Sequence, residues 1–144
     1  MAQVIIYTDG ASSNNQDAEK RVGGWAAILV LVDDEGSPEA TREMSGSLIG
    51  ATNNQAELEA VRQALLALRK PGQRVTIVTD SAYVIGMLSK GWKAKENQAL
   101  IAEIKALLAQ HHVTFEQVRG HDGHAMNERA DRLAVRATKQ RLTD

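Results

Sequence analysis

The sequence contains no cysteine, which excludes disulfide bonds and thiolate metal sites. Aromatic residues make up only 3% of the chain, so a hydrophobic core must be built from leucine, isoleucine, valine and alanine. No apolar run approaches the roughly 20 residues that span a bilayer, and the start of the chain lacks the pattern of a signal peptide. These absences favour a reducing compartment, and we expect the protein to be cytoplasmic and not bound to membranes.

An excess of charge of one sign is missing as well. The chain has 17 Lys and Arg residues against 18 Asp and Glu, and this balance provides no whole-protein attraction for nucleic acid. Local groups such as Lys90, Lys93 and Lys95 therefore matter more than the sum. With 144 residues, of which 43% are hydrophobic, the composition is typical of one globular domain, and we expect residues 1–144 to form a single domain and a monomer.

Turn signals divide the chain into alternating strands and helices. Three β-rich runs come first, the first of them ending in a turn at Asp9 and Gly10, and the order predicts two hairpins. Two further strands then alternate with helices that begin near Thr52, Ala82, Asn97 and Asn127. This order predicts an α/β fold with a five-stranded mixed sheet, three antiparallel strands followed by parallel ones, and helices on both faces. The expected strands are residues 3–8, 23–32, 41–48, 74–79 and 113–118.

Two helix starts carry residues that can cap a helix. Thr52 and Gln55 have the spacing of a capping box, in which each side chain bonds the backbone of the other residue. Asn97 is a candidate N-cap for the helix that carries Leu100 and Ile104.

Four carboxylates occupy comparable places along the chain. Asp9 and Asp80 each follow a β-rich run, while Glu57 and Asp131 lie early in predicted helices. Taken singly, the first pair is explained by turns and the second by the helix dipole. Taken together, four such groups would repel one another unless a cation binds, and an all-oxygen ligand set selects hard ions such as Mg²⁺ or Mn²⁺.

Four segments in this order resemble type 1 ribonuclease H across nearly the whole chain. Residues 7–10 (Tyr-Thr-Asp-Gly) are similar to the first catalytic segment of that family. Residues 52–58 and 79–84 are similar to the second and third. Residues 119–124, which contain His121, followed by residues 127–131, resemble its histidine loop and fourth segment.

The resemblance implies the ribonuclease H-like fold and an endonuclease that cuts the RNA strand of RNA–DNA hybrids. Asp9, Glu57, Asp80 and Asp131 would hold two Mg²⁺ ions, for which Mn²⁺ can substitute, while a water attacks the phosphate in line and leaves 3′-hydroxyl and 5′-phosphate ends. His121 would assist proton handling or product departure, although a plain surface-loop histidine is the simpler interpretation. Zinc is disfavoured because the two loop histidines lack a tight tetrahedral ligand set.

The resemblance also implies residues that bind the hybrid. Asn53 and Asn54 would line its minor groove, where the 2′-hydroxyl distinguishes RNA from DNA. Thr52 would help to hold a DNA phosphate. Trp92, with Lys93 beside it, would pack on the DNA strand, or else be a half-buried tryptophan on a solvated lysine face. Backbone groups of Gly10 and Ala11 would face the ribose.

The sequence departs from the family at three places. Residues 11–21 form a polar segment where the family has a glycine- and proline-rich turn. Ala82 stands where a glutamine that touches bases is common. Residues 86–97 leave no room for the basic helical handle that some members carry.

Three alternatives remain open at the level of sequence. The first is another two-metal nuclease of this fold that acts on DNA, such as an integrase or a Holliday-junction resolvase. The second is a non-catalytic module that binds hybrids, although a binder gains nothing from acids that face phosphate. The third is the nuclease domain of a larger replicase. We favour a free-standing protein because the first strand begins close to Met1.

Overall fold

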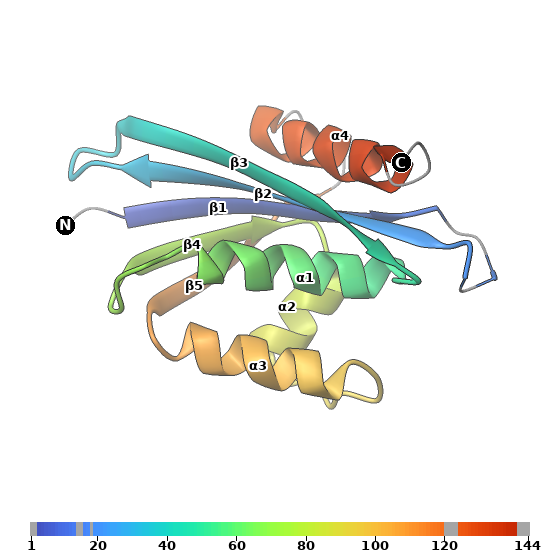
Figure 1. Ribbon diagram of the computed structural model, residues 1–144. Helices are drawn as coiled ribbons and strands as arrows, with labels where there is room; N and C mark the ends of the chain where they lie inside the picture. Colours follow the sequence, from blue (N-terminus) through green and yellow to red (C-terminus); the bar gives the residue numbers. More distant parts are fainter. Residues whose placement is uncertain (1–2, 14–15, 18, 120–123, 141–144) are drawn as a thin grey trace.

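A five-stranded sheet with helices on both faces organises the chain (Figure 1). The computed structural model describes residues 3–13, 16–17, 19–119 and 124–140. The strands are β1 (Gln3–Ser12), β2 (Val22–Val32), β3 (Pro38–Ile49), β4 (Arg74–Thr79) and β5 (His112–Gln117). The helices are α1 (Asn53–Leu66), α2 (Ala82–Leu88), α3 (Gln98–Leu108) and α4 (Ala125–Gln140).

The sheet has the order β3-β2-β1-β4-β5. β2 pairs antiparallel with both β1 and β3, whereas β4 pairs parallel with both β1 and β5. The predicted mixed sheet, with its antiparallel strands first, is therefore confirmed. No helix in the described part of the chain is long and apolar enough to cross a membrane.

Each face of the sheet has its own hydrophobic core. On one face, α1, α2 and α3 cover a cluster that includes the fully buried Ile6, Leu58 and Ile77. On the other face, α4 alone covers a smaller cluster that includes Ile28 and Ala134. Both clusters are mainly aliphatic, as the scarcity of aromatic residues predicts.

The structure corrects two local predictions. β1 does not end in a turn at Asp9, because residues 9–12 go on pairing with β2, from Ala26 back to Gly23. Asn97 precedes α3 but does not cap it through its side chain. Its backbone is left-handed, with φ of 60°, and its amide instead donates a hydrogen bond to the hydroxyl of Tyr83 at 3.0 Å.

A close approach at Gly24 fixes the position of α4 on the sheet. A Cβ atom on Gly24 would lie 2.1 Å from the carbonyl oxygen of Ala134 and 2.9 Å from the backbone nitrogen of Thr138. The β3 side of the helix is held by Arg129, whose Nε and Nη2 donate to Glu43 at 2.7 and 2.9 Å. Since α4 carries Asp131, these contacts also determine where that carboxylate lies.

We predict that Gly24→Ala destabilises the protein by roughly 1–3 kcal/mol, because α4 must move away from the sheet to admit a methyl group. Urea unfolding followed by circular dichroism measures the free energy of unfolding. Gly36→Asn is the control, since Gly36 is in an exposed turn with open space around it and asparagine tolerates its positive φ. Equal stability of the Gly24→Ala variant and wild type would show that the contact with α4 yields without cost.

Candidate active site

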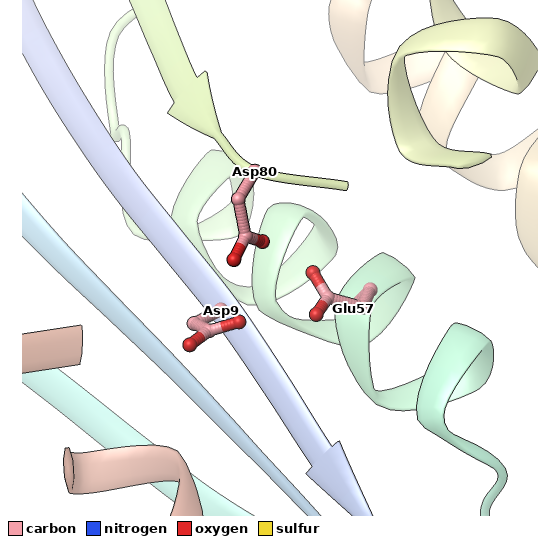
Figure 2. A group of neighbouring side chains, drawn as sticks. All are labelled: Asp9, Glu57 and Asp80. Carbon is pink, nitrogen blue, oxygen red and sulfur yellow. The ribbon is translucent and has the colours of Figure 1, made fainter. Parts of the chain in front are cut away.

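The register of two parallel strands brings Asp9 and Asp80 together. The last paired residues of β1 and β4 are Tyr7 and Val78, and each aspartate lies two residues further along its strand. Asp80 directly follows the end of β4, whereas Asp9 continues in β1. The two carboxylates are therefore neighbours beside the end of β4, where β1 continues (Figure 2).

Glu57 reaches the same point because α1 lies directly against β1. A Cβ atom on Gly10 would be only 2.4 Å from the backbone nitrogen of Glu57 and 2.7 Å from the carbonyl carbon of Ala56. Only glycine permits this approach of helix to strand. One carboxylate oxygen from each of Asp9, Glu57 and Asp80 lies within 4.8 Å of the others, and the three side chains point toward a common space (Figure 2).

Asp131 joins the group from the opposite face of the sheet. It lies in α4, and its carboxyl group is one of the influences that raise the pKa of Asp9. The structure thus brings together three of the four predicted carboxylates, Asp9, Glu57 and Asp80, and the fourth, Asp131, acts on Asp9 from α4.

Burial sets the electrostatics of this cluster. Asp9 and Glu57 are 7% and 4% exposed. Burial, with Asp80 nearby, raises the pKa of Asp9 to about 7, against the opposing effect of a hydrogen bond with Glu57. Burial and the charge of Asp9 raise the pKa of Glu57 to about 10. Without a cation, Glu57 therefore keeps its proton at neutral pH.

The cluster fits a divalent metal ion on two observations. Glu57 Oε2 is buried, and no hydrogen-bond donor among the described residues reaches it. The donor set is all carboxylate oxygen, which hard cations prefer. The helix dipole does not explain Glu57 or Asp131, since the first turn of α1 has no acidic residue and that of α4 has only Glu128.

Thr52 forms the predicted capping box at the start of α1. Its Oγ1 accepts from the backbone nitrogen of Gln55 at 3.2 Å, and its own backbone nitrogen donates to Gln55 Oε1 at 2.8 Å. Asn53 and Asn54 follow in the first turn and are exposed. The cap thus fixes the helix end while leaving both amide side chains available to a ligand.

Two residues of the atypical segment 11–21, Ser12 at the end of β1 and Arg21, stabilise this helix start. Nε and Nη2 of Arg21 donate to the carbonyl oxygen of Gly50 at 3.1 and 2.6 Å, and Ser12 Oγ donates to that of Ala51 at 3.3 Å. Polar side chains of the 11–21 segment therefore hold the backbone just before Thr52. In the sequence this segment departs from the family without indicating a role.

The remaining predicted residues are placed as follows. Gly10 and Ala11 lie within β1, and the Gly10 nitrogen donates to Asp9 Oδ1 at 2.9 Å. Trp92 is 47% exposed, with its indole ring against Gly86 of α2, and Lys93 is exposed beside it. One face of the indole is thus packed while the side chain stays accessible, which agrees with both interpretations of Trp92. His121 lies outside the described residues.

Comparison with known proteins identifies the family of this chain. The model of the RNase H family matches residues 1–139. The chain belongs to the ribonuclease H family. Ribonuclease H of Lachnoclostridium phytofermentans is 44% identical, with 94% of this chain and 91% of that protein covered. Ribonuclease H of Cupriavidus pinatubonensis is 40% identical, with 94% and 95% covered.

Solved structures of ribonucleases H share the fold. A type 1 enzyme with the type 2 active-site motif, LC9-RNase H1, has a TM-score of 0.81 and 31% identity, covering 97% of this chain and 74% of that one. LC11-RNase H1, in complex with an RNA/DNA hybrid, has a TM-score of 0.70 and 25% identity, covering 97% and 99%. Family membership makes this chain an endoribonuclease of RNA–DNA hybrids, and it fits the metal-binding character of the carboxylate cluster.

The raised pKa values predict that the metal-free protein loses stability as pH rises. When the pKa of a carboxyl group is raised in the folded state, the free energy of unfolding is highest below the unfolded pKa of about 4. It falls as pH rises from that value to the folded pKa. The loss therefore extends from pH about 4 to about 7 for Asp9 and to about 10 for Glu57. Glu57→Gln should stabilise the metal-free protein at pH 7 by at least about 1 kcal/mol.

Thermal melts in chelator between pH 5 and 9, with Glu96→Gln as an exposed control, measure this effect. Mg²⁺ should then raise the melting temperature of wild type more than that of Glu57→Gln, because it binds the folded cluster. A metal-free Glu57→Gln variant less stable than wild type at pH 7 would contradict the electrostatic account.

Proposed function

We propose that this chain cuts the RNA strand of RNA–DNA hybrids with two Mg²⁺ ions held by Asp9, Glu57, Asp80 and Asp131, and that Mn²⁺ can replace them. The observation that carries the proposal is the convergence of three carboxylates within 4.8 Å, from segments far apart in a ribonuclease H chain. A hybrid-bound relative, LC11-RNase H1, supports the choice of substrate.

The four carboxylates have the task of fixing the cations against the scissile phosphate. Bound cations supply the positive charge that neutralises these groups, stabilises the phosphate in its transition state and makes water a better nucleophile. Asp9 is central to the arrangement, because it lies with Glu57 and Asp80 and its pKa also responds to Asp131 of α4. In-line attack by water leaves 3′-hydroxyl and 5′-phosphate ends.

Recognition of the hybrid uses the exposed end of α1 and the Trp92 region. Asn53 and Asn54 offer amide donors and acceptors to the minor groove, where the 2′-hydroxyl marks the RNA strand. Thr52, next to them, can approach a DNA phosphate. Trp92 and Lys93 are exposed, so the indole can pack against a sugar while the ammonium meets phosphate. Gly10 and Ala11 would contact the ribose only through their backbone.

We also propose that the chain acts as one ribonuclease H domain over residues 1–144, as a monomer in the cytoplasm. The family match over residues 1–139 supports the single domain. The absence of cysteine supports the compartment.

We predict cleavage of the RNA strand, with the DNA strand intact, only when Mg²⁺ or Mn²⁺ is present. Hybrids labelled on either strand and separated on denaturing gels test this, with duplex DNA and duplex RNA as further substrates. Asp9→Asn should abolish cleavage because it removes a ligand, while Asp34→Asn in the exposed β2–β3 turn should leave it unchanged. Equal cutting of duplex DNA, or full activity in chelator, would refute the proposal.

His121→Ala should slow turnover without abolishing it. A group that handles protons contributes typically ~10²–10⁴-fold to the rate, while the electrostatic contribution of the cations remains. Steady-state kinetics on a hybrid should show a lower kcat and a nearly unchanged KM, with His112→Ala on β5 as the control. A kcat equal to that of wild type would make His121 a surface residue without a part in the reaction.

A further inference from the structure

We infer that a groove on the outward side of α4 binds backbone phosphates of the RNA strand next to the cut. This α4 groove has a volume of about 350 Å³ and is lined by Asp131, Arg132, Val135, Arg136 and Lys139. The inference rests on the proposed function, because it takes the RNA strand to lie at the carboxylate cluster. It adds a substrate-binding surface to the site described above.

The groove carries a row of three cations. Arg132, Arg136 and Lys139 are all exposed, and their spacing of four and three residues places them along one side of the helix. At about 1.5 Å per residue the row is roughly 10 Å long, close to the axial rise of about three nucleotides if the B-DNA value of about 3.4 Å each is taken. Its length and charge therefore match a short stretch of phosphates.

Within the part of the chain that the structure describes, none of these three cations has an ion-pair partner within 4.0 Å. Among the described residues, the ion pair of α4 is formed by Arg129, which binds Glu43. The pKa of Glu43 is lowered first by that hydrogen bond, then by the charge of Arg129 and last by the charge of Arg136, which makes no ion pair there. Positive charge is thus left at the surface of a protein whose net charge is −1.

Stabilisation of α4 through its dipole does not explain why three cations lie in this row. A cation interacts favourably with the helix dipole only in the last turn, where α4 has Lys139, whereas Arg132 is near its middle. Val135, an apolar side chain 37% exposed, lies in the groove among the cations. Cations beside an exposed apolar side chain suit a sugar–phosphate backbone, which presents both phosphates and apolar sugar edges.

Asp131 connects the groove to the reaction. This residue lines the groove, and it is near enough to Asp9 of the carboxylate cluster to act on the pKa of that group. A strand whose phosphate lies at the cluster therefore has its neighbouring phosphates within reach of the row. The other strand is assigned to the opposite side, because Thr52 and Trp92 belong to the face covered by α1 and α2 (Figure 1).

The test compares two triple variants with equal loss of charge. Arg132→Gln, Arg136→Gln and Lys139→Gln together neutralise the groove. The control, Arg69→Gln, Lys70→Gln and Arg74→Gln, neutralises three exposed cations near the start of β4, at the far end of that strand from Asp80. Melting temperatures first establish that both variants are folded.

The groove variant should raise KM for a hybrid of two helical turns roughly tenfold and leave kcat nearly unchanged. The log–log salt dependence of binding, measured by fluorescence anisotropy in chelator, should become shallower by about 2–3, at close to one unit per lost phosphate contact. The control should resemble wild type in both measurements. Equal effects of the two variants, or none from the groove variant, would overturn the inference.

Truncated hybrids test the strand assignment. Shortening only the RNA strand on the side of the groove should remove the difference between wild type and the groove variant, whereas shortening only the DNA strand should preserve it. The reverse pattern would overturn the assignment to RNA. Failure of the proposed function is recognised separately, because wild type would then leave the RNA strand uncut. The anisotropy measurement would still report whether the groove binds phosphate.

Discussion

The contact between α1 and β1 at Gly10 is the constraint on which the site depends. At this contact the helix backbone lies against the strand with no room for a Cβ atom, so helix and strand are joined as one rigid unit. The same helix buries Leu58 and Val61 in the larger core. Burial of that apolar face stabilises the fold, and the stability gained there offsets the cost of holding Glu57 beside Asp9.

The position of the carboxylates follows from where β4 ends. Within a continuous sheet, side chains from opposite faces are separated by the backbone of the strands. β1 extends beyond β4, so its edge is open next to Asp9, and groups from α1, α4 and the end of β4 meet there. Gly24 permits the close approach of α4 to the sheet, as Gly10 permits that of α1 on the opposite face. Two glycines thus set the distances within a cluster to which neither contributes a side chain.

Much of this arrangement could be predicted from the sequence because the signals are local. The capping box at Thr52, the strand at residues 74–79 and the short helix at Ala82 each depend on a few neighbouring residues. The extent of β1 was predicted wrongly because its last four residues are polar or small and are held by pairing with β2, a contact distant in sequence. The capping role of Asn97 was wrong for a similar reason, since its side chain bonds Tyr83 instead. The grouping of the four carboxylates came from a family resemblance, because no local pattern states which strand ends are neighbours.

The proton that Glu57 retains has a consequence for how the site takes up its ions. At neutral pH the metal-free cluster holds Glu57 protonated and Asp9 partly so. A cation that coordinates these groups must displace the protons into solution. Binding is therefore an exchange of hydrogen ions for metal, and the enthalpy observed in a calorimeter must vary with the ionisation enthalpy of the buffer. The same exchange makes apparent metal affinity increase with pH, so that the concentration of free metal ion needed to fill the site is greatest in acidified surroundings.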